Sequence, residues 1–199
     1  MKQTNTRTLV TKDVRRVYSY YSEEHLLQTP NGPPEQARYS EAQELLKPVL
    51  TSSRTRSIFK INNPYLKTAF ENKKAQLQHQ NPNVQYEVKW LFHGTSSSNV
   101  TSIADENIDW RLHGTKTGQL YGRGAYFASQ ASDALRYGDV IFICHVLVGL
   151  TATGSPDTIK PPKDRFNRPI DTTVDNTVNP TIFVKYDSQE YYPVYYELF

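Results

Sequence analysis

The apolar run at residues 140–150 constrains this 199-residue chain more than any other feature. It reads VIFICHVLVGL and predicts a strand packed in a hydrophobic core. It is much shorter than the roughly 20 apolar residues that span a bilayer, so no membrane span is predicted. Cys144 lies within it and is the chain's single cysteine. We expect Cys144 to be buried as a small hydrophobic residue, and one cysteine excludes an intramolecular disulfide or a cysteine-based zinc cluster.

Other patterns predict an α+β fold in which strands dominate the second half. Residues 86–93 alternate with period two, which places Tyr86 and Trp90 on one face and His93 on the other. Asn63 followed by Pro64 predicts a helix start. Short runs predict further strands at 58–61, 182–186 and 191–198, helices near 98–104 and 129–137, a loop at 107–124 and a long connection at 151–178.

The chain is expected to consist of a leader, residues 1–55, and one domain, residues 56–199. Within the leader, Pro and Gly predict a loop at 28–34, and Ser40 is expected to cap a helix that ends before Pro48. The first residues show no secretory signal, which together with the lone cysteine indicates an intracellular protein, cytoplasmic or nuclear. The net charge of +3 comes from scattered Lys and Arg, which does not indicate a nucleic-acid-binding stripe.

Three short motifs carry candidate chemistry. HGT at 93–95 follows a strand, and its glycine allows a ligand to approach the backbone closely. YGRGAYFA at 121–128 places two glycines before two aromatic residues, one of which can face a planar ligand while the other packs inward. NPTIFV at 179–184 reads as a strand with Ile182 in the core. Taken singly, the first motif is more typical of a structural histidine, the second is as typical of a β-turn with two core aromatic residues, and the third is an ordinary strand.

In this order and spacing, the motifs resemble the catalytic signature of the poly(ADP-ribose) polymerase superfamily, over roughly residues 56–199, and most of all the branch that transfers a single ADP-ribose. The resemblance implies the ADP-ribosyltransferase fold: α+β, with two packed, mainly antiparallel sheets and short flanking helices. Further segments resemble the family's entry strand and first helix, the loop over the NAD donor and the closing segments: 58–66, 109–114, 174–176 and 189–193.

The resemblance also implies roles for individual residues. The family's catalytic triad maps onto His93, Tyr126 and Ile182. It implies that His93 hydrogen-bonds the 2′-hydroxyl of the nicotinamide ribose, that the Gly94 backbone holds the carboxamide, and that Tyr126 and Tyr137 sandwich the nicotinamide ring. The other implied donor-binding residues are Arg111 along the phosphate and adenosine side, Thr95, Tyr121, Phe127, Ala128 and Ser132. NAD+ is the implied co-substrate, without a metal.

Two positions depart from the family pattern. Ile182 stands where chain-building members carry glutamate, so it cannot polarise an incoming sugar hydroxyl, and a single transfer is predicted. Ala134 stands where many members carry a serine that contacts the carboxamide. The expected acceptor is a protein, with a nucleic-acid end kept open, and the expected state is a monomer without membrane contact.

Two other functions can be compared with the same residues. A binding module that holds NAD or ADP-ribose without catalysis accords with both departures, although His93 and Tyr126 are retained. An RNA 2′-phosphotransferase of the same general fold would need Arg and His residues converging on a phosphate. The histidines at 79, 93, 113 and 145 are not arranged with arginines in that way.

Overall fold

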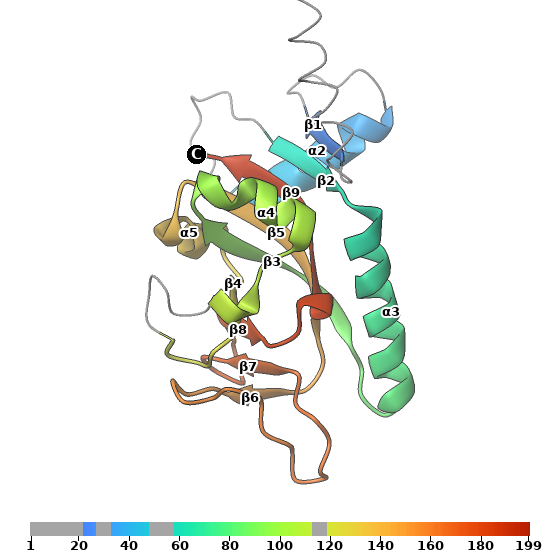
Figure 1. The fold of residues 1–199 in the computed structure, drawn as a ribbon, viewed down its shortest axis with the longest axis vertical. Helices are drawn as coiled ribbons and strands as arrows, with labels where there is room; N and C mark the ends of the chain where they lie inside the picture. Colours follow the sequence, from blue (N-terminus) through green and yellow to red (C-terminus); the bar gives the residue numbers. More distant parts are fainter. Residues whose placement is uncertain (1–21, 27–32, 48–57, 113–118) are drawn as a thin grey trace, which may run out of the picture.

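The structure is a computed structural model that describes residues 22–26, 33–47, 58–112 and 119–199. Its strands follow one hydrogen-bonded order, β1-β2-β9-β5-β3-β4-β8-β7-β6 (Figure 1). They are β1 (Ser22–Leu26), β2 (Ile58–Asn62), β3 (Glu87–Thr95), β4 (Ala125–Ala128), β5 (Val140–Val148), β6 (Thr151–Thr153), β7 (Thr172–Val174), β8 (Ile182–Lys185) and β9 (Tyr191–Leu198). The helices are α2 (Pro33–Leu46), α3 (Pro64–Gln80), α4 (Val100–Glu106) and α5 (Ala131–Ala134), with 3₁₀ turns η1 (Ser97–Asn99), η2 (Trp110–Leu112), η3 (Leu135–Tyr137) and η4 (Ser188–Glu190).

Strand β5 is apolar because the fold buries both of its faces. It pairs with β3 on one side and with β9 on the other. Ile141 and Ile143 belong to one core cluster, and Phe142 and Cys144 belong to a second cluster on the opposite face. Cys144 is fully buried, as its position in the apolar run predicts.

Helices cover both faces of the sheet. Helices α2, α3 and α5 contribute Leu46, Phe70 and Ala134 to the first cluster, whereas α4 contributes Ile103 to the second. Figure 1 shows α3 running along one side of the sheet and α4 lying across it. Asn63 caps α3 as the sequence predicts: its side-chain oxygen accepts hydrogen bonds from the Tyr65 and Leu66 amides, at 3.1 and 3.0 Å.

The sheet has a weak junction near its middle, because β3 and β4 share one residue pair, Phe92 with Ala128. The pairs are antiparallel except for β6 with β7. The α+β class and the mainly antiparallel pairing are therefore confirmed. The expected division into two packed sheets is not confirmed, because the strands connect through this junction into one order.

Several local predictions were wrong. Helix α2 begins at Pro33, so Ser40 lies inside it and does not cap it; residues 28–32 of the expected loop lie outside the described residues. Residues 129–137 hold the short α5 and a 3₁₀ turn instead of one helix. The connection at 151–178 contains β6 and β7, and the 121–128 motif contains β4. Such short strands are defined by their partners, which a local pattern cannot show.

The described part of the leader packs against the domain. Strand β1 pairs with β2, and Tyr39 and Ala42 of α2 are buried in the first core cluster. The Tyr195 hydroxyl donates a hydrogen bond to the Glu41 carboxylate at 2.7 Å. The boundary near residue 55 stays a prediction, but it would cut through these contacts. No helix among the described residues is both long and apolar enough to cross a membrane.

Candidate active site

His93 lies near the end of β3, at the weak junction with β4. Its Nδ1 is 2.9 Å from the Tyr126 carbonyl oxygen. Because a carbonyl can only accept a hydrogen bond, Nδ1 carries the proton and the lone pair of Nε2 remains available as an acceptor. The ring is half-buried and lies 5.9 Å from the Phe127 ring. Burial lowers the pKa of His93, which keeps the imidazole neutral at pH 7.

Tyr126 of β4 is held by the turn that precedes its own strand. Its hydroxyl donates a hydrogen bond to the Gly122 carbonyl at 2.7 Å and accepts one from the Tyr121 amide at 3.0 Å. Burial raises the pKa of Tyr126 to about 12, so the phenol stays protonated. The ring is therefore fixed in place, and its hydroxyl is already used by the backbone.

That turn is held in place by residues far away in the sequence. Thr173 of β7 donates a hydrogen bond to the Tyr121 carbonyl at 2.6 Å, so the Tyr186 hydroxyl, also 2.6 Å from the Thr173 oxygen, must donate to it. Gly122 has φ +129°, and a Cβ there would lie 1.8 Å from the Tyr186 hydroxyl. No local motif marks Thr173 or Tyr186, and both were missed from the sequence.

Gly94 allows α5 to lie directly on β3. A Cβ at Gly94 would be 1.7 Å from the Ala134 carbonyl oxygen, so any side chain there would displace α5. Gly138 is packed in the same way, since its Cβ would lie 2.0 Å from the Thr95 carbonyl oxygen. Between these two contacts η3 carries Tyr137, whose side chain is exposed. The resemblance implies that Tyr137 forms the nicotinamide sandwich with Tyr126 of β4.

Ile182 begins β8, opposite Ala128 of β4. Phe92 also pairs with Ala128, so Phe92, Ala128 and Ile182 form one row across three strands. The Ile182 amide donates a hydrogen bond to Asp175 at 3.0 Å, and the half-buried side chain packs against the first core cluster. The position that the resemblance implies as the third of a triad therefore presents hydrocarbon without a proton acceptor.

The structure groups most of the sequence-predicted residues around the β3–β4 junction. Those in or beside the junction are His93, Gly94, Thr95, Tyr121, Tyr126, Phe127, Ala128 and Ile182. Ser132 is exposed on α5. Arg111 is exposed on η2 and is held by Asp109, with its Nε and Nη2 at 2.8 and 2.9 Å from the two carboxylate oxygens. Residues 113–114 of the segment that resembles the donor loop lie outside the described residues.

The family model described as "Poly(ADP-ribose) polymerase catalytic domain" matches residues 37–196. The chain belongs to this family. The match begins at residue 37, inside α2, so it includes most of a helix that belongs to the leader expected from the sequence.

The relatives of this poly(ADP-ribose) polymerase family domain described below are all named as mono-ADP-ribosyltransferases. The chain is 36% identical over 149 residues to mouse "Protein mono-ADP-ribosyltransferase PARP12", which covers 69% of this chain and 20% of that protein. It is 32% identical over 185 residues to human "Protein mono-ADP-ribosyltransferase PARP11", covering 79% of this chain and 54% of that protein. For human "Protein mono-ADP-ribosyltransferase PARP14" the identity is 30% over 154 residues, covering 71% and 8%. The chain thus spans about half or less of these proteins.

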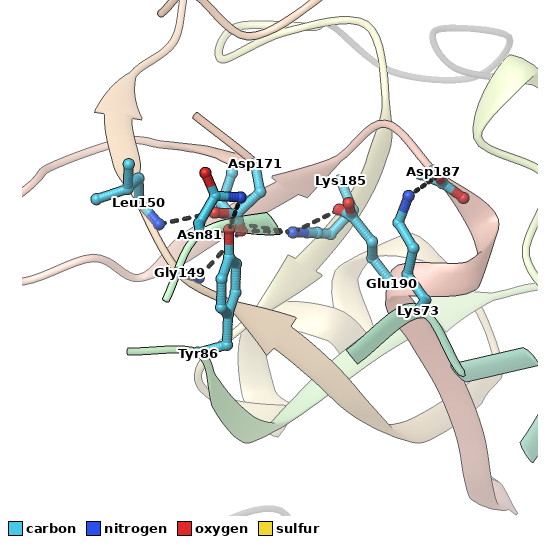
Figure 2. A network of polar contacts seen from close by, with 10 residues as sticks. Lys73, Asn81, Tyr86, Gly149, Leu150, Asp171, Lys185, Asp187 and Glu190 are labelled. Carbon is cyan, nitrogen blue, oxygen red and sulfur yellow. Dashed lines mark hydrogen bonds and ion pairs between the residues drawn. The ribbon is translucent and has the colours of Figure 1, made fainter. Parts of the chain in front are cut away.

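A buried charge cluster supports β8 in this poly(ADP-ribose) polymerase domain (Figure 2). Lys185 is fully buried, and its Nζ lies 2.8 Å from Asp171 and 2.7 Å from Glu190. Burial opposes the charge of Lys185, but the two carboxylates outweigh it and raise its pKa. Asp171 also accepts hydrogen bonds from the Gly149 and Leu150 amides, at 3.0 and 2.7 Å. The cluster therefore joins β8 to Asp171 and the Gly149–Leu150 backbone on one side, and to η4 on the other.

Proposed function

We propose that this domain transfers a single ADP-ribose from NAD+ to a protein acceptor and releases nicotinamide. The observation that carries the proposal is the hydrogen bond from His93 Nδ1 to the Tyr126 carbonyl, which leaves a neutral imidazole with Nε2 as a free acceptor beside a fixed tyrosine ring. Family membership and the names of the relatives support the same activity. Bound NAD+ would supply the ADP-ribosyl group by cleavage of its glycosidic bond to nicotinamide.

The described residues fit such a donor. Nε2 of His93 can accept a hydrogen bond from a ribose hydroxyl, which orients the sugar for the reaction. Tyr126, whose hydroxyl is held by the Gly122 carbonyl, and the exposed Tyr137 are the two rings proposed to stack on the nicotinamide. Stacking contributes roughly 0.5–1.5 kcal/mol per aromatic pair beyond burial. Because burial keeps Tyr126 protonated, its role here is to stack and not to transfer a proton.

A mixture of labelled NAD+ and candidate acceptor proteins, followed by mass spectrometry of the modified residue, tests the proposal. We expect one ADP-ribose on an acidic side chain, because a carboxylate is ionised at neutral pH and needs no base. Binding of NAD+ without release of nicotinamide would instead establish the alternative, a non-catalytic binding module. That alternative accords with Ile182 and Ala134, the two departures from the family pattern.

The product is expected to remain a single unit even after Ile182→Glu. Chain extension needs an acceptor hydroxyl whose proton is taken up as it attacks, and the Ile182 side chain offers no site for that proton. Restoring a carboxylate does not by itself create a site for a polymer end beside the 151–178 connection. Gel electrophoresis of labelled products should show one discrete band for both proteins. A ladder of long polymer from the unmodified protein would contradict the single-transfer mechanism.

Ala134→Ser is expected to strengthen the binding of a benzamide-type ligand several-fold. Ala134 is 2% exposed, and its carbonyl lies over Gly94, where the carboxamide is proposed to bind. A hydroxyl there would add a neutral hydrogen bond, worth about 0.5–1.5 kcal/mol. Calorimetry on both proteins measures the change. Ala75→Ser is the matched control: Ala75 is exposed on α3, so the same substitution there should leave affinity unchanged. Unchanged or weaker binding by Ala134→Ser would mean that another group already makes this contact.

A further inference from the structure

The sheet lacks a strand where β4 ends. Strand β4 lies between β3 and β8, but beyond Ala128 it continues for only one contact, in which the Ser129 amide donates a hydrogen bond to the Thr181 carbonyl at 2.9 Å. The chain then turns into α5. Within the part of the chain that the structure describes, no strand pairs with β3 on this side along residues 87–91.

The register shows which residues face each other across this gap. Phe92 of β3 and Ile182 of β8 both pair with Ala128, so each step beyond Ala128 moves one residue back along both walls. Continued past the start of β8, this register sets Trp90 across from Pro180 and Lys89 across from Asn179, in a wall of bends held partly by the Asn176 side chain. An extended chain between two strands needs two strand spacings, about 9.6 Å.

A cavity occupies the same place. Its volume is about 510 Å³. It is lined by Lys89, Trp90, Leu91, Ser129, Val178, Asn179, Pro180, Thr181 and Phe183. Six of these lining residues are the ones that the continued register sets across from each other: Lys89, Trp90 and Leu91 on one side, and Asn179, Pro180 and Thr181 on the other. We call this cavity the strand gap.

The β3 wall of the strand gap is the edge of a sheet. Every second residue of β3 directs its N–H and C=O into the gap, because in an antiparallel strand these groups alternate between the two edges. An unpaired edge of this kind binds an extended chain by adding it as a strand. Trp90 and Pro180 make one row apolar, whereas Lys89 and Asn179 make the next row polar. Lys89 is the single charged residue in the lining, and Glu87 holds it at 2.6 Å at the partly exposed rim.

We propose that the strand gap binds an extended segment of the acceptor protein as a strand antiparallel to β3. An apolar side chain of the segment lies between Trp90 and Pro180, and a polar or acidic side chain follows it between Lys89 and Asn179. Three to four residues, about 10–13 Å of chain, fill the gap. This rests on the proposed function, because the wall at Thr181 continues directly into Ile182, so the bound segment runs beside the transfer site. The substrate class is therefore extended protein segments and not folded surfaces.

Asn179→Trp tests this by filling the strand gap from an exposed wall position. The probe is a mixture of ten-residue peptides with Leu-Glu fixed at the centre. We expect the KM for peptide modification to rise at least tenfold, while the release of nicotinamide from NAD+ without peptide stays unchanged. The matched control is Thr177→Trp, which adds the same side chain at an exposed position of the same connection outside the lining. This control should modify peptides as the unmodified protein does.

A binding measurement without NAD+ separates this proposal from the proposed function. Amide hydrogen exchange at residues 87–91 should slow when the peptides are added, but not when the central backbone nitrogens of the peptides are methylated, since pairing with the β3 edge needs those groups. Protection without any nicotinamide release would refute the transfer activity and leave the strand gap standing. Equal binding of methylated peptides, equal modification by Asn179→Trp, or concentration-dependent protection of the protein alone, which indicates a second copy in the gap, would each overturn the proposal.

Discussion

Replacement of Lys185 by methionine is expected to lower the free energy of unfolding by about 3–5 kcal/mol, the cost of removing one partner from a buried ion pair. Lys185 is fully buried, and the side chains of Asp171 and Glu190 are 5% and 8% exposed. Without the ammonium group, two carboxylates would face each other with little access to water. Burial already raises the pKa of Glu190 in the presence of Lys185. Urea denaturation followed by circular dichroism measures the loss.

An exposed ion pair supplies the control for this experiment. Lys47 and Glu44 form a pair in which both side chains are more than 70% exposed, at 73% and 72%. Such pairs contribute about 0–1 kcal/mol, so Lys47→Met should change stability little. The double variant Lys185→Met with Glu190→Gln should recover part of the loss, because it removes one of the two stranded charges. If Lys185→Met were as stable as Lys47→Met, the cluster would not support β8.

His93→Ala is expected to reduce kcat/KM for ADP-ribosyl transfer at least roughly tenfold, which corresponds to about 1.4 kcal/mol of transition-state stabilisation. The substitution removes the Nε2 acceptor proposed for the ribose, and it leaves the Tyr126 carbonyl without its hydrogen bond. Nicotinamide release measures the rate, and circular dichroism reports whether the fold is intact. His79→Ala is the control, because His79 is exposed near the end of α3. A folded His93→Ala protein with full turnover would exclude His93 from the reaction.

The same assignment has a consequence for pH dependence. Because burial lowers the pKa of His93 below its ordinary value, the imidazole stays neutral through pH 7 and becomes protonated only on further acidification. Protonation places a hydrogen on Nε2, so the acceptor is lost. Transfer that depends on His93 should therefore hold from pH 8 to 7 and fall as the pH drops below the usual range for histidine. The residual activity of His93→Ala should lack this fall.

Much of the candidate site was visible in the sequence because each motif carries a local signal. Alternation from Tyr86 to His93 correctly separated Trp90 and Phe92, which lie in the first core cluster, from His93, which contacts Phe127 of the second. Asn63 before Pro64 correctly located the start of α3. The roles of His93, Tyr126 and Ile182 in the reaction remain predictions.

The supporting residues could not be found in this way, because their partners are distant in the chain. Lys185 reads as an ordinary lysine at the end of a strand. Its burial depends on Asp171 and Glu190, which only the folded chain brings next to it. Tyr121 and Thr173 are 52 residues apart, yet one hydrogen bond between them holds the turn that fixes Tyr126. Gly94 suggested close approach of a ligand, and the structure adds a second reason for glycine there, because a Cβ would collide with the Ala134 carbonyl oxygen of α5.

The sequence by itself determined the apolar central strand, the α+β class and the family. Burial on both faces of β5 requires a nearly continuous apolar run, which His145 alone interrupts, and a family signature needs only order and spacing. The tertiary structure alone decided how the strands join. Strand β4 has four residues, Ala125–Ala128, and it lies between β3 and β8 through one residue pair with β3 and four with β8, both far away in the chain. Because hydrogen bonds between strands form without regard to sequence distance, the junction, the charge cluster and the strand gap appear only when the chain is folded.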